Sequence, residues 1–267
     1  MTQESIIRRS EAVGKAGKTE IVTVDRSNVE ETGFFCYMSK RKSEGYLRKL
    51  AWLKARLDEG IRIKILKLPE RGFIEYIPGE NAWRAVDAEG WMVIHCLWVV
   101  GKSKGRGFGA VLLEECVKDA RNAGMLGVAM VTSEGNWLAG KRLLESRGFQ
   151  AVATAPPSFT LMVKSLKPGP PPSFPGDWTA RAARYGSGLT ILRSDQCPYL
   201  PDATRILLEA AAKKGIIARV VDFRTARDVQ SLSPSPYGVF NIVYKGRLLG
   251  HHYLKEEDFL EALGRNS

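Results

Sequence analysis

The chain of 267 residues is long enough for one large domain or two ordinary ones. Its hydrophobic fraction of 44% and charged fraction of 26% exclude a disordered polymer, and no apolar run approaches the roughly 20 residues that cross a bilayer. The formal charge of +11 favours an anionic partner, and most of this excess lies before Ser187, because the rest of the chain holds 11 Lys and Arg against 9 Asp and Glu.

The basic residues are dispersed rather than gathered in one run with aromatics, so an anionic small molecule is favoured over nucleic acid. The four cysteines and three histidines have no metal-ligand spacing, and we expect no metal site. Residues 1–18 lack the apolar segment of a signal peptide, so we expect a cytoplasmic protein with reduced thiols and no membrane attachment. Nothing in the sequence indicates the oligomeric state.

The first part of the chain, to about residue 166, contains both strands and helices. Alternating or continuous apolar runs predict strands, and apolar residues three or four positions apart predict helices that end at glycine. The predicted strands are 20–25, 61–68, 72–77, 91–100, 126–132 and 158–165, and the predicted helices are 43–60, 110–124 and 136–149. A β-rich half followed by β-α-β-α-β predicts a mixed α/β (α+β) domain.

A proline-rich segment divides the chain. Residues 167–178, KPGPPPSFPGDW, contain five prolines and two glycines and cannot continue a helix or a sheet interior. We therefore predict one domain over 1–166, a linker over 167–186 and a smaller domain over 187–267.

The second domain has the predicted order β-α-β-α-β-β-α, with a hairpin that turns at Lys245–Gly246. This is the order of thioredoxin-like domains, and CPY at 197–199 resembles the active-site loop of glutaredoxins. The N-terminus of the helix that follows is expected to lower the pKa of the Cys197 thiol. Leu200 stands where a resolving cysteine would be, which excludes dithiol cycling within this loop. Two alternatives stay open: Cys197 acts as a single thiol, or it is inert.

The glycine-rich segment KGRGFG, residues 104–109, joins a predicted strand to a predicted helix. A helix N-terminus exposes unpaired N–H groups with partial positive charge, and glycines let a phosphate approach them closely. Lys102, Lys104 and Arg106 add positive charge. The segment lacks the GK[ST] of a Walker A loop, and the third glycine of a dinucleotide fingerprint would fall on Ala110. The pattern predicts a phosphate or pyrophosphate ligand.

The longer stretch LWVVGKSKGRGFGAVLL resembles motif A of the GNAT acyltransferases, [RQ]-x-x-G-x-[GA], with Lys104 in the first position and Gly107 and Gly109 as the small residues. A predicted helix that ends in Gly148-Phe149 is a second similarity. The whole chain resembles GNAT-type N-acetyltransferases that carry a C-terminal YoaP-like, thioredoxin-like domain.

The resemblance implies a GNAT acyltransferase fold, acetyl-CoA as the acyl donor, and a small-molecule acceptor. It also implies that the donor lies along a strand edge and on the glycine loop. The residues implied in binding acetyl-CoA are Leu97, Trp98, Val99, Lys104, Gly105, Arg106, Gly107, Phe108, Gly109, Ala110 and Asn136.

Acetyl transfer to an amine needs a base and a proton donor. Many GNAT members carry a tyrosine as the acid where this chain has Leu144. The candidate bases are Glu75, whose apolar neighbours are expected to raise its pKa, and His95, on the strand before the loop. A purely structural role is the alternative for each, as it is for Cys36 and Cys96. Alternation along the strand puts Cys96 on the face opposite His95.

Three functions remain open. The first is an acyltransferase that moves an acetyl group from acetyl-CoA to a small amine or thiol-containing acceptor, with the C-terminal domain aiding acceptor recognition. The second is a thiol-binding or redox protein centred on Cys197, with a GNAT module that senses CoA. The third is a nucleic-acid or protein adaptor that uses the basic N-terminal part of the chain.

Overall fold

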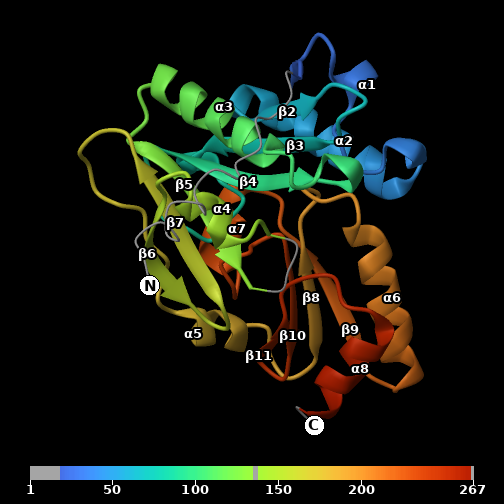
Figure 1. Ribbon diagram of the computed structural model, residues 1–267. Helices are drawn as coiled ribbons and strands as arrows, with labels where there is room; N and C mark the ends of the chain where they lie inside the picture. Colours follow the sequence, from blue (N-terminus) through green and yellow to red (C-terminus); the bar gives the residue numbers. More distant parts are fainter. Residues whose placement is uncertain (1–18, 135–137, 266–267) are drawn as a thin grey trace, which may run out of the picture.

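The computed structural model describes residues 19–134 and 138–265. These residues form two sheets: in Figure 1 the first runs across the top and down the left side, and the second lies below the first sheet's upper strands. The first sheet has the strand order β1-β2-β3-β4-β5-β7-β6, and the second has the order β11-β10-β8-β9. The predicted mixed α/β class is confirmed.

Neighbouring strands of the first sheet are antiparallel, except for the parallel pair β4 and β5. The strands are β1 (Ile21–Val24), β2 (Arg62–Leu66), β3 (Gly72–Pro78), β4 (Trp91–Val99), β5 (Gly127–Ser133), β6 (Gln150–Ala155) and β7 (Phe159–Ser165). The helices of this part are α1 (Val29–Thr32), α2 (Glu44–Arg56), α3 (Phe108–Asn122) and α4 (Lys141–Glu145).

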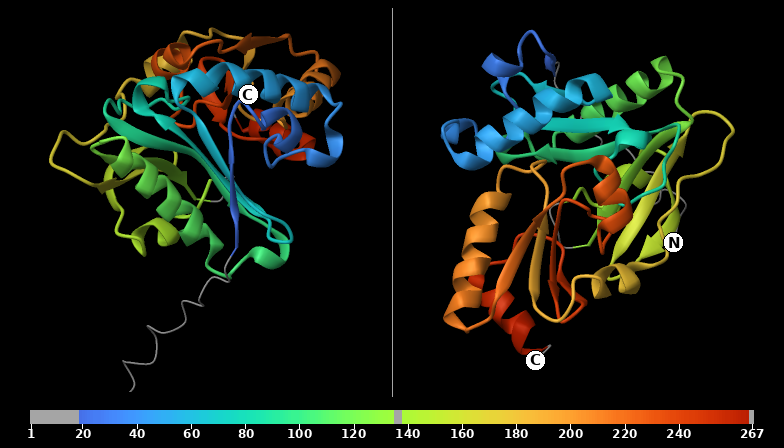
Figure 2. Two further views of the ribbon diagram at one scale, coloured as in Figure 1. Left: turned by 90° about the horizontal axis from the view of Figure 1, so that it is seen from above. Right: turned by 180° about the vertical axis from the view of Figure 1, so that it is seen from behind.

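Both faces of the first sheet are covered. Helix α3 packs on one face, where Ile74 and Tyr76 of β3 enter its hydrophobic cluster. Helix α2 and the second sheet lie on the opposite face (Figure 2, left). Phe73 and Ile77 of β3 belong to the hydrophobic cluster on that face. Residues 72–77 of β3 are therefore all buried, including the charged Glu75. Its carboxylate lies on the face shared by α2 and the second sheet.

Helix α2 begins and ends where the sequence predicts. The Ser43 hydroxyl accepts a hydrogen bond from the N–H of Tyr46, which satisfies one of the free donors of the first turn. A 3₁₀ turn over Leu57–Glu59 follows, and Gly60, with a φ of +87°, ends the segment. Glycine suits this position because it adopts positive φ without a steric penalty.

Four segments differ from the sequence-based prediction, and the first is α1, a short helix that was not predicted. The helix predicted over 136–149 is short, since α4 covers only Lys141–Glu145 of the described residues. Strand β6 was not predicted, because it is an edge strand with mostly exposed small residues and no apolar alternation. The predicted linker contains a helix, α5 (Trp178–Ala183), and its Ser173 forms a bridge with Asp87.

The second sheet is built from β8 (Leu189–Arg193), β9 (Ala218–Asp222), β10 (Phe240–Tyr244) and β11 (Arg247–Gly250), with helices α6 (Leu200–Lys213), α7 (Ala226–Leu232) and α8 (Glu256–Gly264). Strands β8 and β9 are parallel, and β10 is antiparallel to β8 and to β11. The predicted order of these elements and the hairpin turn at Lys245–Gly246, where both residues have positive φ, are confirmed.

The first turn of α2 packs closely against the second layer, which consists of the second sheet with its helices and loops. The backbone at Gly45 lies so near the loop before α6 that an added Cβ would be 1.9 Å from the carbonyl oxygen of Pro198. Two polar contacts join the same regions: the Tyr37 hydroxyl donates to Asp202 at 2.6 Å, and Arg48 Nε donates to Asp195 at 2.7 Å. A side chain at position 45 would therefore push the two layers apart.

We expect Gly45→Ala to destabilise the protein by about 1–3 kcal/mol through this overlap, although alanine favours helices more than glycine does. Gly264→Ala is the matched control, because Gly264 is also helical and an added Cβ there meets nothing within 4 Å. Chemical denaturation of both variants tests this. Equal stability of the two variants would contradict the close packing of α2 on the Pro198 loop.

Candidate active site

The glycine loop lies between the end of β4 and the start of α3. Gly105 and Gly107 have φ of +73° and +82°, a region that other residues rarely adopt. Gly107 is the N-cap of α3 and no side chain caps the helix. Within the described residues, the backbone N–H groups of 105–109 have no hydrogen-bond partner. They are free to bind an anion.

A cavity of about 450 Å³ opens over this loop. It is lined by eight of the residues that the resemblance implied, namely Leu97, Val99, Lys104, Gly105, Gly107, Phe108, Gly109 and Ala110. Arg147 also lines this cavity, although its sequence context did not mark it, and its Nε has no hydrogen-bond partner among the described residues. Arginine is well suited to bind phosphate.

Three of the implied residues do not line this cavity. Arg106 turns away, because its Nη1 donates to both carboxylate oxygens of Glu70 at 2.6 and 2.8 Å. Trp98 points to the opposite face of the sheet and meets the ring of Phe35 edge-on. Asn136 lies outside the described residues.

Strands β4 and β5 separate beside the cavity. Their pairing runs from Trp91–Gly127 to Ile94–Met130 and then stops, although β4 continues to Val99 and β5 to Ser133. Beyond Ile94, one edge of β4 is therefore unpaired with its parallel neighbour. An extended ligand can form backbone hydrogen bonds along such an edge.

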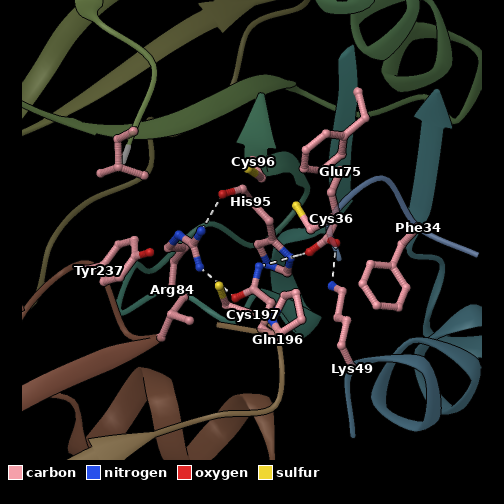
Figure 3. Close-up of a pocket in the computed structure, with 14 residues that line it drawn as sticks. Phe34, Cys36, Lys49, Glu75, Arg84, His95, Cys96, Gln196, Cys197 and Tyr237 are labelled. Atoms are coloured by element: carbon pink, nitrogen blue, oxygen red, sulfur yellow. Dashed lines mark hydrogen bonds and ion pairs between the residues drawn. The ribbon is translucent and has the colours of Figure 1, made fainter. Parts of the chain in front are cut away.

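A buried polar cluster surrounds Glu75 on the other face of the sheet (Figure 3). Lys49 Nζ of α2 donates to Glu75 Oε2 at 2.5 Å. His95 Nδ1 lies 3.2 Å from Glu75 Oε1, and Gln196 Nε2, from the second sheet's layer, donates to the same oxygen at 2.9 Å. These four side chains join α2, β3, β4 and the loop after β8.

The protonation states of the pair follow from these contacts. The backbone N–H of Trp83 donates to His95 Nε2 at 2.9 Å, so a neutral His95 carries its proton on Nδ1 and donates it to Glu75. Burial lowers the pKa of His95 to about 4 despite the hydrogen bond to Glu75. Both ring nitrogens of His95 are therefore engaged.

The expectation that burial would raise the pKa of Glu75 is wrong. Burial does act in that direction, but the Lys49 ammonium and the His95 hydrogen bond outweigh it and lower the pKa to about 2. Glu75 is an ionised carboxylate that accepts three hydrogen bonds at about four lone-pair sites. One site remains for a ligand.

The expectation that Cys96 faces away from His95 is also wrong. The register of β3 and β4 shifts between Glu75–Cys96 and Tyr76–Ile94, so His95 is the extra residue of a β-bulge. His95 and Cys96 consequently line the same cavity. The bulge also reverses the alternation that follows and directs Leu97 and Val99 to the glycine-loop cavity.

The cavity beside Glu75 has a volume of about 70 Å³ and lies between the two sheets. Thiols from three distant positions, Cys36, Cys96 and Cys197, line it together with residues of both layers. Glu75, His95 and these cysteines are far apart in the sequence, and no local pattern indicates that they meet. The cavity's remaining lining residues are Phe34, Lys49, Phe73, Arg84, Leu138, Gln196, Pro198, Tyr237 and Val239.

The prediction that the following helix would lower the pKa of Cys197 is wrong. Burial raises the pKa of this thiol to about 11, and the hydrogen bond from the backbone at Tyr199 offsets only part of that effect. Burial likewise raises the pKa of Cys96 to about 12. Near neutral pH these thiols are protonated.

Lys49, Arg84 and Gln196 are site residues that the sequence analysis missed. Lys49 left one signal, since it falls on the apolar stripe of α2, three residues after Tyr46 and four before Leu53. Arg84 and Gln196 are in loops, where no periodicity marks a buried position. Leu144, at the position of the usual GNAT tyrosine, is buried in the core and has no proton to donate.

The described residues contain neither a metal-binding cluster nor a membrane-spanning helix. No group of three or more His, Cys, Asp or Glu side chains within 19–134 and 138–265 is arranged to hold a metal ion. In the same residues, every helix is too short or too polar to span a bilayer.

Comparison with known proteins supports the predicted activity class. No protein-family model matches the chain. Over 246 residues, 91% of this chain and 97% of the relative, it is 29% identical to an uncharacterized N-acetyltransferase, YoaP, of Bacillus subtilis strain 168. The name of this relative supports N-acetyl transfer as the activity class of the chain.

Solved structures match a little over half of the chain. A GNAT acetyltransferase from Brucella melitensis in complex with acetyl-CoA is 16% identical, with a TM-score of 0.37 over 60% of this chain and 97% of that one. A GNAT acetyltransferase from Staphylococcus aureus Mu50 is 16% identical, with a TM-score of 0.41 over 56% and 100%. The PaiA N-acetyltransferase of Thermoplasma acidophilum, in complex with coenzyme A, is 18% identical, with a TM-score of 0.39 over 56% and 99%.

The buried histidines predict how stability depends on pH. Burial lowers the pKa of His95 and of His251 from 6.5 to about 4, so the unfolded chain binds more protons than the folded one between these values. Their contribution is fully present above pH 6.5 and is lost as the pH falls toward 4. We expect the free energy of unfolding to decrease over this window.

Chemical denaturation across that pH range measures the effect in the wild type, in His95→Gln and in His251→Gln. Each variant should show a shallower decrease, because it no longer carries one of the titrating groups. A slope as steep as that of the wild type in both variants would contradict the neutral, buried state of these histidines.

Proposed function

We propose that the protein transfers an acetyl group from acetyl-CoA to a small amine or thiol-containing acceptor, which binds in the cavity between the two sheets. The observation that carries this proposal is a glycine loop with unpaired N–H groups beside a strand edge that leads to a buried polar cavity. Residues along β4 border both cavities: Leu97 and Val99 border the first, and His95 and Cys96 the second.

The first cavity suits the donor. The free N–H groups of residues 105–109, with Lys104 and Arg147, are the groups we assign to the pyrophosphate. The unpaired part of β4, from Leu97 to Val99, is assigned to the extended pantetheine arm. Acetyl-CoA supplies an activated thioester to this site.

The second cavity suits the acceptor. In the reaction a bond forms between the acceptor's nitrogen or sulfur and the acetyl carbon, the carbon–sulfur bond to CoA breaks, and the acceptor's proton ends on the CoA thiol. We assign to Glu75 the role of orienting the acceptor through its remaining lone pair, because a carboxylate with a pKa of about 2 is a weak base. His95 holds Glu75 in place, since both of its ring nitrogens are occupied.

The second sheet and its helices, residues 187–267 of our proposed division, help to form the acceptor site. Gln196 donates to Glu75 and accepts from Arg84 at 2.8 Å, which links the layers at the cavity. We propose a thioredoxin-like fold for this part, supported by the strand order β11-β10-β8-β9 and by the position of Cys197 between β8 and α6. The Ser235–Pro236 bond is trans, unlike the cis proline common in that fold.

Binding of acetyl-CoA tests the first part of the proposal. Gly105→Val should weaken it about tenfold or more, because a branched side chain would occupy the space beside the loop N–H groups. Gly124→Val is the matched control, since Gly124 also has a positive φ, of +68°, and open surroundings but lies after α3. Isothermal titration calorimetry measures both variants. Equal losses would show that backbone strain, and not the loop's position, causes the effect.

The alternative, a redox protein centred on Cys197, is favoured by the meeting of three thiols in one cavity. The raised pKa of Cys197, about 11, opposes it, because near pH 8 only about one thiol in a thousand is ionised.

We therefore expect Cys197 in the folded protein to react with an aromatic disulfide reagent far more slowly than a free thiol, and faster as the pH rises toward 11. Comparison of the wild type with Cys197→Ser, by absorbance of the released thiolate, isolates its contribution. Rapid reaction of Cys197 at neutral pH would favour the redox alternative.

A further inference from the structure

Arg84 is in the loop that connects β3 to β4. Its side chain forms part of the wall of the smaller cavity and is only 2% exposed. Its Nη1 donates to the carbonyl oxygen of Trp83 and to Gln196 Oε1, both at 2.8 Å, and its Nη2 donates to the carbonyl oxygen of His95. Its guanidinium lies 5.2 Å from the centre of the Tyr237 ring. The Nε–H has no hydrogen-bond partner in the described part of the chain.

The charges around this cavity do not balance. Lys49 and Glu75 neutralise each other at 2.5 Å, His95 is uncharged, and the thiols of Cys96 and Cys197 are protonated. Arg84 makes no ion pair with any carboxylate in residues 19–134 or 138–265. One positive charge is therefore buried without a counter-charge, an arrangement that costs free energy unless an anion binds.

A second buried arginine shows the usual solution. Arg181 is 7% exposed and lies against the ring of Trp178, and it also donates to backbone carbonyl oxygens. Its Nε, however, is paired with the Asp177 carboxylate at 2.6 Å. The two arginines therefore differ. Among the described residues the Nε–H of Arg84, in a cavity wall, has no partner, whereas the Nε–H of Arg181 is paired with a carboxylate.

A purely structural role for Arg84 explains less. Its three hydrogen bonds all go to neutral oxygens, which a neutral donor also satisfies, and they give no reason for a positive charge in the cavity wall. The unpaired Nε–H and the unbalanced charge both favour an anionic ligand. A carboxylate suits it, because guanidinium–carboxylate hydrogen bonds are charge-assisted and directional.

We propose that the smaller cavity selects an acceptor that carries a carboxylate, which Arg84 binds. This inference rests on the proposed acetyltransferase function, whose acceptor class it narrows. At roughly 10–15 Å³ for each water-sized group, about 70 Å³ holds a molecule the size of alanine or cysteine. The carboxylate pairs with Arg84, and the amine or thiol of the same molecule donates to the remaining lone pair of Glu75.

Calorimetric titration of the full chain tests the proposal with probes that differ in the carboxylate. Alanine is compared with alaninamide, and cysteine with cysteamine, each with and without acetyl-CoA present. We expect alanine and cysteine to bind about tenfold to a hundredfold more tightly than the matched compounds without a carboxylate. This is the range typical of hydrogen bonds to charged groups. If neither acid binds better than its partner, the proposal is wrong.

Arg84→Gln identifies the residue responsible, and Arg181→Gln is its matched control. Arg84→Gln should remove the preference for the acids and leave acetyl-CoA binding unchanged, while Arg181→Gln should keep the preference. Retention of the preference in Arg84→Gln would overturn the assignment. If Arg84→Gln does not fold, the comparison of acids with amides in the wild type still decides whether the cavity selects a carboxylate.

Failure of the acetyltransferase proposal gives a different result. Titration with acetyl-CoA alone, and the release of free CoA in the presence of acceptor, measure that activity without reference to Arg84. No binding of acetyl-CoA contradicts the proposed function even where the acids bind. Binding of acetyl-CoA together with equal binding of acids and amides contradicts only the carboxylate selection.

Discussion

The arrangement of both layers depends on the hydrogen bonds and the ion pair of the buried Glu75 carboxylate. This carboxylate is buried in the first sheet and is held by Lys49 from α2, by His95 from the neighbouring strand and by Gln196 from the second layer. A buried carboxylate is stable only when its oxygens are paired. Each of these elements must therefore lie where it does for the charge to be tolerated.

The β-bulge at His95 separates two sets of side chains along one strand. Before and at the bulge, β4 directs His95 and Cys96 to the cavity between the sheets. After it, Leu97 and Val99 face the glycine loop. One strand thus borders both the cavity that we propose for the phosphate-bearing donor and the smaller cavity that we propose for the acceptor.

The smaller cavity is a product of the two layers together. The first sheet contributes Glu75 and His95, and the second layer contributes Gln196, Cys197 and the ring of Tyr237. Burial between the layers lowers the pKa of His95 and raises that of Cys197, because the charged form of either group loses its hydration there. The second layer therefore changes the chemistry of groups on the first.

The local pattern of the sequence determined most of the elements. Runs such as 72–77 and 91–100 were recognised as strands because both of their faces are buried, and the glycine loop was recognised because its spacing suits a helix N-terminus. The edge strand β6 carries no such pattern and was missed. One cause explains both the strands that were predicted and the strand that was missed, since burial leaves an apolar run or an apolar period in the sequence and an exposed edge leaves neither.

The tertiary structure alone decided the site. The bulge moved Cys96 to the face of His95, and Lys49 reversed the expected pKa shift of Glu75. The packing of the layers left Arg84 buried without a carboxylate partner in the part of the chain that the structure describes. Each outcome depends on contacts between residues far apart in the chain. A charge's surroundings are set by what folds against it, so the sequence determined which elements form, and only their packing decided which charges meet.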